Sequence, residues 1–196
     1  LVTLGETGNA DYAPGLDIGW AQLNNTAQMD AANVCTASMG WQDAGDWDTR
    51  APHLEAAAYL MVLVERFPSL YNTLELGIPG ESGNDVPALL EHDLWLVDSY
   101  RLLGQRADSG VSGGFETLSH PHLGDISTHQ SQPYLCYAPG RFSTLHYVAA
   151  AAQAARLLAP FDATRATAIA ESARLAFAWA EANTDVPPLP SGDVTK

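Results

Sequence analysis

The sequence predicts an all-α chain with long irregular loops. Apolar residues recur at helical spacing in several segments between residues 51 and 184, which predicts helical hairpins there. No stretch shows the alternation of a half-buried strand, and the connections are rich in Gly, Pro, Ser and Asp. A chain of 196 residues can bury a hydrophobic core, so we expect a single domain over residues 1–196.

The first predicted helix runs from Pro52 to about Phe67. Residues 1–50 show little periodicity and are predicted to form an irregular N-terminal segment. Proline suits the first turn of a helix, so Pro52 favours a start there. Pro68 is expected to end the helix, and a linker over residues 69–83 follows.

The second predicted helix is capped by Asn84 or Asp85. Its apolar residues fall on two faces: Val86, Leu90, Leu94 and Val97 on one, and Leu89, Leu96 and Leu103 on the other. A helix that is apolar on two faces is expected to pack on both sides. Glu91, His92 and Arg101 on this helix are predicted to form a polar rim.

A long loop over residues 108–140 separates the two helical halves. Loops of this length are usually functional or disordered. A third helix is predicted over residues 142–158, and a fourth runs from the cap Asp162 to about Ala182. One face of the fourth helix is predicted to carry Ile169, Ala173, Phe177 and Ala180. Residues 185–196 are rich in proline and predict a loop or linker.

The charge balance is strongly acidic, with 23 Asp and Glu against 9 Lys and Arg and a net charge of −14. This charge repels phosphate backbones and anionic membranes, so we expect no nucleic-acid and no membrane partner. A neutral polysaccharide is unaffected by it. Acidic, Lys-poor surfaces are common among secreted enzymes, and the chain begins at Leu1 without a signal peptide, as a processed chain would. We therefore expect an extracellular or periplasmic location.

The two cysteines, Cys35 and Cys136, fit neither a zinc pattern nor a redox pair. One disulfide in an oxidising compartment and two buried free thiols are the alternatives.

Residues 40–50 carry the most informative chemistry and read Gly-Trp-Gln-Asp-Ala-Gly-Asp-Trp-Asp-Thr-Arg. This run, the acidic motif, contains the carboxylates Asp43, Asp46 and Asp48 and the aromatic residues Trp41 and Trp47. Its central glycine permits a turn that lets the carboxylates converge. Tryptophan rings offer flat apolar faces that suit the C–H faces of a sugar. The alternative is an acidic loop that binds calcium structurally or caps a helix, which is the expected role of Asp48.

The acidic motif resembles the Asp-Ala-Gly-Asp signature of glycoside hydrolase family 9. A second block, Ile-Pro-Gly-Glu-Ser-Gly-Asn-Asp-Val-Pro-Ala-Leu-Leu over residues 78–90, is similar to a stretch that opens a barrel helix in that family. A looser third block is Gly113-Gly114-Phe115-Glu116 with His120-Pro121 and Tyr137-Ala138-Pro139. The resemblance implies the N-terminal part of an (α/α)6 barrel and inverting hydrolysis of β-1,4-glycosidic bonds in cellulose or related β-glucans. Exo-acting β-glucosidase or glucosaminidase activity is a variant within the same family.

The resemblance also implies roles for individual residues. Asp46 corresponds to the general base that activates water, and Asp43 to the residue that holds the same water. Trp41 and Trp47 are candidates for the lining of the substrate cleft, with core packing as the alternative. No cofactor is expected for catalysis, and structural calcium remains an alternative.

The chain departs from the family pattern at several places. Gly80 interrupts the Pro-Glu-Ser run, and Ala88 stands where the family usually has Asp. The resemblance covers the first half of the barrel, and the block that carries the family's general acid is missing. It therefore implies that the remaining half comes from an unshown segment, a second chain or a symmetry mate. A non-catalytic carbohydrate-binding remnant is the competing hypothesis.

The loop over residues 108–140 also contains a group of potential metal ligands, Glu116, His120, His122, Asp125 and His129. Their spacing fits no pattern of paired zinc ligands, so we expect no metal site. Glu116 is not expected to replace the missing general acid, because the resemblance places that acid elsewhere.

Overall fold

The computed structural model describes residues 34–35, 40–41, 49–77, 85–117, 134–136 and 139–184. The long helices are α2 (His53–Arg66), α4 (Ala88–Ser99), α5 (Arg141–Leu158) and α6 (Ala163–Ala182). Two shorter helices are α3 (Pro68–Tyr71) and the π-helix η2 (Tyr100–Gly104), which directly continues α4. The all-α class predicted from the sequence is confirmed.

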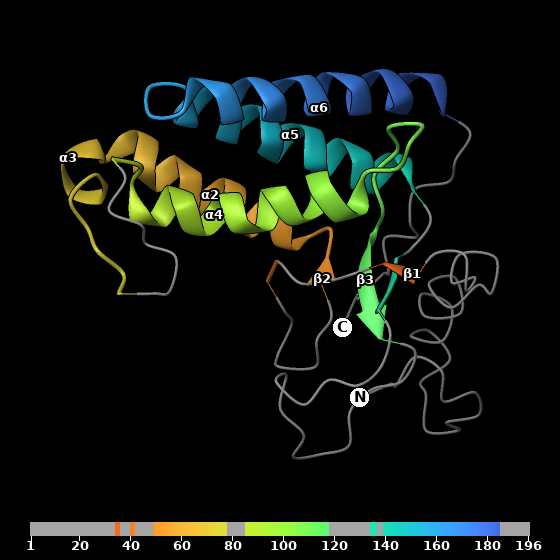
Figure 1. Ribbon diagram of the computed structural model, residues 1–196, viewed down its shortest axis with the longest axis horizontal. Coiled ribbons are helices and arrows are strands. Elements are labelled where there is room, and N and C mark those ends of the chain that lie inside the picture. Colours follow the sequence, from red (N-terminus) through yellow and green to blue (C-terminus); the bar gives the residue numbers. More distant parts are fainter. Residues whose placement is uncertain are drawn as a thin grey trace, which may run out of the picture.

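The long helices lie side by side and alternate in direction (Figure 1). Helices α2 and α5 run one way, while α4 and α6 return the other way. Helix α4 contacts both α2 and α5, and α5 packs along the whole of α6. This is the arrangement of stacked helical hairpins.

A small antiparallel sheet lies where α2 and α5 begin and α4 ends (Figure 1). Its strands are β1 (Val34–Cys35), β2 (Thr49–Arg50), β3 (Gly114–Thr117) and β4 (Tyr134–Cys136), in the order β1-β4-β3-β2. Strands of two to four residues are too short to show alternation, which is why the sequence did not reveal them. Two of them lie in the predicted loop over residues 108–140.

The two cysteines belong to neighbouring strands of this sheet. Strand β1 pairs with β4, and the register places Cys35 opposite Tyr134 and Val34 opposite Leu135. Residues 35 and 136 are therefore close in the fold although they are far apart in the sequence. Whether they form a disulfide stays a prediction.

Helix α4 is packed on both sides, as its two apolar faces predicted. From both sets Leu89, Leu90, Leu94, Leu96 and Val97 are buried. The predicted cap at Asp85 is wrong, because α4 begins at Ala88 with Pro87 at its N-cap and no side-chain cap. The proline ring disfavours helical geometry at the preceding residue, which delays the start. Asn84 lies outside the described residues.

Proline has a second effect at the end of α2. Pro68 follows the end of α2, as predicted, but it also opens α3, where the sequence suggested a linker. Proline is favoured at the first helical position because its missing N–H has no partner there anyway. The predicted cap of α6 is confirmed, since the carboxylate of Asp162 accepts a hydrogen bond from the backbone N–H of Arg165 at 2.9 Å.

Small residues set the contact between α5 and α6. The buried positions of this contact include Ala150, Ala151, Ala154, Ala166, Ile169, Ala173 and Ala176. Alanine side chains let the two helix backbones approach closely where they are in contact. Phe177 departs from the predicted buried face of α6 and is 48% exposed.

Candidate functional site

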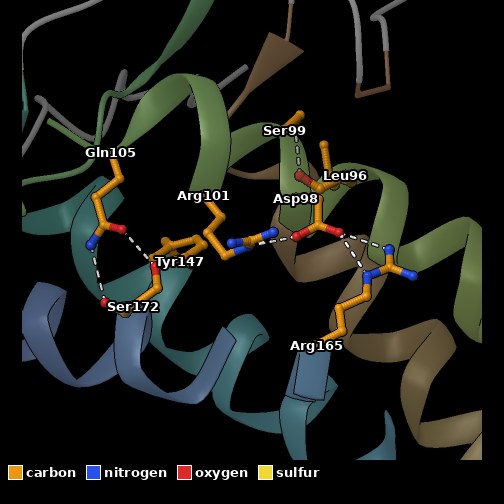
Figure 2. Close-up of polar contacts among 8 residues, drawn as sticks. All are labelled: Leu96, Asp98, Ser99, Arg101, Gln105, Tyr147, Arg165 and Ser172. Atoms are coloured by element: carbon orange, nitrogen blue, oxygen red, sulfur yellow. Dashed lines mark hydrogen bonds and ion pairs between the residues drawn. The ribbon is translucent and has the colours of Figure 1, made fainter. Parts of the chain in front are cut away.

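The acidic motif begins on the surface of α4. Gly40 has a φ of +101°, a conformation that residues with a Cβ rarely adopt. A Cβ at this position would lie 2.8 Å from the Oγ of Ser99. Ser99 is itself fixed, because its hydroxyl donates to the carbonyl of Leu96 at 2.6 Å (Figure 2). The backbone at residue 40 thus lies directly against α4, where only glycine fits without strain.

Trp41, the first aromatic residue of the motif, is partly buried and packs against the core. Its ring stacks on the imidazole of His92, with centroids 4.7 Å apart and planes inclined by 29°. The sequence left two alternatives for Trp41, the lining of a substrate cleft and core packing. The structure shows packing against the core and against His92, and the role in a cleft stays a prediction. His92, predicted to belong to a polar rim, is partly buried, and its ring supports the ring of Trp41.

Asp93 follows His92 and is fully buried. Neither carboxylate oxygen has a hydrogen-bond partner among the described residues. Burial raises the pKa of Asp93 to about 8, because the charged form would lose its hydration. Burial also lowers the pKa of His92. Both side chains are therefore uncharged at neutral pH.

The other end of the acidic motif is held by the sheet. Thr49 and Arg50 form β2, which pairs with β3 so that Thr49 lies opposite Phe115 and Arg50 opposite Gly114. The N–H of Ala51 then donates to the carbonyl of Gly113 at 3.0 Å. The motif is therefore fixed at one end to α4 and at the other end to the sheet.

Several residues singled out by the sequence lie outside the described residues. These are Asp43, Asp46, Trp47 and Asp48 of the motif, and His120, His122, Asp125 and His129 of the loop. The predicted roles of these residues stay predictions. Glu116 lies on β3, opposite Leu135 of β4.

A polar network crosses the helices beside the motif (Figure 2). Asp98 on α4 accepts from Nε of Arg101 at 2.6 Å and from Nη2 of Arg165 on α6 at 2.7 Å. Arg165 also pairs with Glu91 at 3.5 Å. Glu91 and Arg101, predicted with His92 as a polar rim, are partly buried members of a network that ties α4 to α6.

A second chain of hydrogen bonds joins α5, α6 and the residue after η2 (Figure 2). The hydroxyl of Ser172 donates to Oε1 of Gln105 at 2.6 Å and lies 2.6 Å from the hydroxyl of Tyr147. The amide of Gln105 returns a hydrogen bond to the carbonyl of Ser172 at 3.0 Å. Each of these polar groups has a hydrogen-bond partner. Together the bonds hold α5 and α6 in place relative to Gln105.

The sequence analysis missed Asp93, Asp98 and Arg165. One signal pointed to Asp93: it stands at helical spacing between Leu90 and Val97, within a face that is otherwise apolar. No comparable signal exists for Asp98 and Arg165, because their contact joins residues that are 67 positions apart.

An open groove of about 600 Å³ runs between α5 and α6. Its lining is mostly alanine, with Val148, Arg156, Arg174 and Phe177. Both arginines already form ion pairs, Arg156 with Glu65 and Arg174 with Glu171. No residue of α4 or of the acidic motif lines this groove.

Two further properties hold for the described part of the chain. It contains no group of three or more His, Cys, Asp or Glu side chains arranged to hold a metal ion. Within the same residues, no helix has the length and apolar character required to cross a membrane.

Comparison with solved structures links this geometry to known proteins. A thermostable endoglucanase from Alicyclobacillus acidocaldarius, solved as a single mutant, matches 82% of this chain with a TM-score of 0.69 and 28% identity. A metagenome-derived glycoside hydrolase family 9 endoglucanase matches 80% with a TM-score of 0.68 and 30% identity. The structure matches part of a glycoside hydrolase family 9 domain. The resemblance seen in the sequence is thereby confirmed, and so is the partial (α/α)6 barrel.

The match covers a minor part of these proteins. The chain spans 31% of the length of the Alicyclobacillus endoglucanase and 28% of the metagenome-derived one. AaCel9A, solved in complex with a cellobiose-like isofagomine, shares the fold at 22% identity and a TM-score of 0.65, and the chain spans 40% of its length. Models of protein families and curated proteins give no match.

Proposed function

We propose that this chain forms part of a glycoside hydrolase that cleaves β-1,4-glycosidic bonds of cellulose or related β-glucans with inversion. The proposal rests on one observation above all. The acidic motif starts at Gly40 and Trp41, which are fixed on α4 of a family 9 fold, and the motif ends in the sheet at Thr49 and Arg50. A short segment held at both ends is suited to present carboxylates in a defined geometry.

In this proposal Asp46 is the general base. It removes a proton from a water molecule on the far face of the sugar, and the water attacks the anomeric carbon as the glycosidic bond breaks. Asp43 holds the same water and orients it. A protonated acid must donate to the leaving oxygen, and in inverting enzymes the two carboxyl groups lie roughly 6.5–9.5 Å apart. The resemblance places that acid outside this chain, in the remaining part of the barrel.

Trp41 and Trp47 are proposed as platforms for the sugar rings. Trp41 uses one side of its ring to stack on His92, and it remains partly exposed. A neutral β-glucan is compatible with the net charge of −14. The cellobiose-like ligand of AaCel9A supports a β-glucan as the ligand of this fold. An extracellular or periplasmic location, where such polymers are found, belongs to the same proposal.

Hydrolysis of cello-oligosaccharides tests the proposal. The chain should be assayed by itself and together with the remaining barrel, and the anomeric form of the first product should be followed by proton NMR. Asp46→Asn is expected to abolish hydrolysis and to leave the fold and sugar binding intact. Asp108→Asn is a matched control, because Asp108 accepts a hydrogen bond from the indole of Trp179 on α6. A retained rate in Asp46→Asn contradicts the assignment of the base.

A non-catalytic carbohydrate-binding role is the second candidate. The observation that fits it is the partly exposed ring of Trp41, which offers a platform for a sugar ring without a catalytic group of its own. This role predicts that calorimetry detects binding of cello-oligosaccharides while no cleavage occurs in any combination. Absence of both binding and cleavage would contradict both candidates. In that case a chelator that lowers the melting temperature would point to an acidic loop that binds calcium.

A further inference from the structure

His92 and Asp93 have no role in the proposed hydrolysis, yet the ring of His92 stacks directly on Trp41. Asp93 is fully buried, and both of its oxygens lack hydrogen-bond partners among the described residues. The Nδ1 atom of His92 is also buried, and it too lacks a hydrogen-bond partner in the described part of the chain. A buried polar group that stays unsatisfied destabilises the fold, and native proteins contain few of them.

The two unsatisfied groups belong to adjacent residues of α4 and lie close together. Oδ1 of Asp93 lies 3.9 Å from Nδ1 of His92. A hydrogen bond between them needs a separation near 2.7–3.0 Å, so an approach of about 1 Å satisfies both atoms. A protonated carboxyl can donate, and the unprotonated Nδ1 of a neutral imidazole can accept.

We propose that His92 and Asp93 are positioning residues that share one proton, and that this proton fixes the imidazole on which Trp41 stacks. In the uncharged pair the carboxyl O–H of Asp93 donates to Nδ1 of His92, and the imidazole carries its own proton on Nε2. The ring of His92 is then held in one orientation, and Trp41 is held over it. The substrate platform assigned to Trp41 under the proposed function depends on this support.

Ionisation of the pair reverses the direction of its hydrogen bond. When Asp93 loses its proton to Nδ1 of His92, the imidazole releases the Nε2 proton to solvent. One proton leaves the pair, and Nδ1–H now donates to the carboxylate. Burial holds the pKa of Asp93 at about 8, so the change falls just above neutral pH. The two groups titrate as a coupled pair rather than separately.

Charged groups on the neighbouring elements have other partners. On α2, Glu55 binds His146 and Glu65 binds Arg156, both of α5. On α4 and η2, Asp98 binds Arg101 and Arg165, and Glu91 pairs with Arg165. The remaining groups of α2 and α5 are His53, Arg66 and Arg141, and Arg141 donates to the carbonyl of Ala180. Burial is the cause of the raised pKa of Asp93.

Nitrogen NMR with isotope-labelled histidine tests the proposal, because it distinguishes a protonated ring nitrogen from an unprotonated one. We expect Nδ1 of His92 to change from acceptor to N–H in a titration from about pH 6 to about pH 10, with a midpoint near pH 8. The indole signal of Trp41 should shift with the same midpoint. In Asp93→Asn the amide donates to Nδ1 at every pH, so both shifts should be lost.

Two further variants complete the test. Asp108→Asn alters another Asp–Trp pair of the chain and should keep the wild-type titration. His92→Phe keeps an aromatic ring under Trp41 without nitrogen, and it should remove the pH response of the Trp41 indole. A Trp41 signal that does not respond to pH in the wild-type chain, or responds equally in Asp93→Asn, would overturn the proposal.

The affinity for cello-oligosaccharides is measured in parallel. We expect it to fall above pH 8 in the wild-type chain and to stay constant in Asp93→Asn. If no oligosaccharide binds at any pH, the proposed function fails, while the NMR titration still decides whether the pair exists. If the oligosaccharide binds with the same pH dependence in both chains, the pair does not position Trp41.

Discussion

The hydroxyl oxygens of Tyr147 on α5 and Ser172 on α6 lie 2.6 Å apart in the buried interface of the two longest helices. Because Ser172 donates its proton to Gln105, the tyrosine hydroxyl is the donor to Ser172. Burial raises the pKa of Tyr147 to about 12, so the hydroxyl keeps this proton at all ordinary pH values. This contact places a directed polar link within an interface whose buried positions are mostly alanine and other apolar residues.

Tyr147→Phe is expected to destabilise the chain by about 1–2 kcal/mol, because the hydroxyl of Ser172 loses its buried donor. Urea denaturation at neutral pH measures the change. Tyr59→Phe is the matched control, since Tyr59 is 72% exposed and its substitution should have little effect. Equal stability of the Tyr147 variant and the wild type would show that the link contributes nothing.

Asp98 joins α4 to α6 through Arg165. Its replacement should lower the free energy of unfolding by more than Tyr147→Phe does. Asp98→Asn removes the carboxylate that two partly buried guanidinium groups share and leaves Arg165 only its longer pair with Glu91, so we expect a loss of about 2–4 kcal/mol. Glu171→Gln breaks an exposed ion pair with Arg174 and should cost less than about 1 kcal/mol. Thermal unfolding of both variants checks the difference, and losses of similar size would contradict it.

The raised pKa of Asp93 predicts an unusual dependence of the free energy of unfolding on pH. Its carboxyl ionises near pH 3.8 when the chain is unfolded but near pH 8 when it is folded. Between these values the folded state retains a proton that the unfolded state loses, so stability falls as pH rises, by about 1.4 kcal/mol per unit. Asp93→Leu removes this contribution. The variant should therefore gain stability over the wild type as pH increases from about 4 to about 8.

Chemical denaturation at several pH values, with Asp93→Leu beside the wild type, measures this gain. A constant difference between the two chains over the whole range would show that Asp93 is ionised in the folded state. A loss of stability in the variant at high pH would mean that a group beyond the described residues binds the carboxylate.

Gly40 tests how the acidic motif is held on α4. Gly40→Ala forces an alanine into the φ of +101° that Gly40 adopts, which strains the backbone. It also places a Cβ only 2.8 Å from the Oγ of Ser99. Gly77→Ala is the matched control, because Gly77 also has a positive φ but no neighbour within 4 Å of its Cβ. We expect Gly40→Ala to cost about 1–3 kcal/mol more than the control, since the added methyl group has no space.

Gly40→Ala should also weaken binding of cello-oligosaccharides, whereas Gly77→Ala should not. Calorimetric titration of both variants provides the comparison. Equal affinity in the two variants would mean that contact with α4 does not shape the carbohydrate site.

Much of the fold could be predicted from the sequence, because a helix depends on residues that are close together in the chain. Periodic apolar residues predicted the long helices, and the two apolar faces of α4 predicted that it packs on both sides. The cap at Asp162 was predicted from its residue type alone, since a cap depends on groups three residues apart. The family resemblance was carried by the acidic motif in the same way, as a contiguous run of residues.

The tertiary structure decided what depends on residues distant in the sequence. The strands of the sheet are too short to show a pattern, and they exist because β3 and β4 pair across the loop. Trp41 stacks on His92, and Asp98 binds Arg165. Each contact joins segments that are far apart in the sequence, so no local pattern predicts it. Likewise, the unusual pKa of Asp93 arises from burial. Local sequence determines which segments are helical, and packing determines which polar groups lose their water.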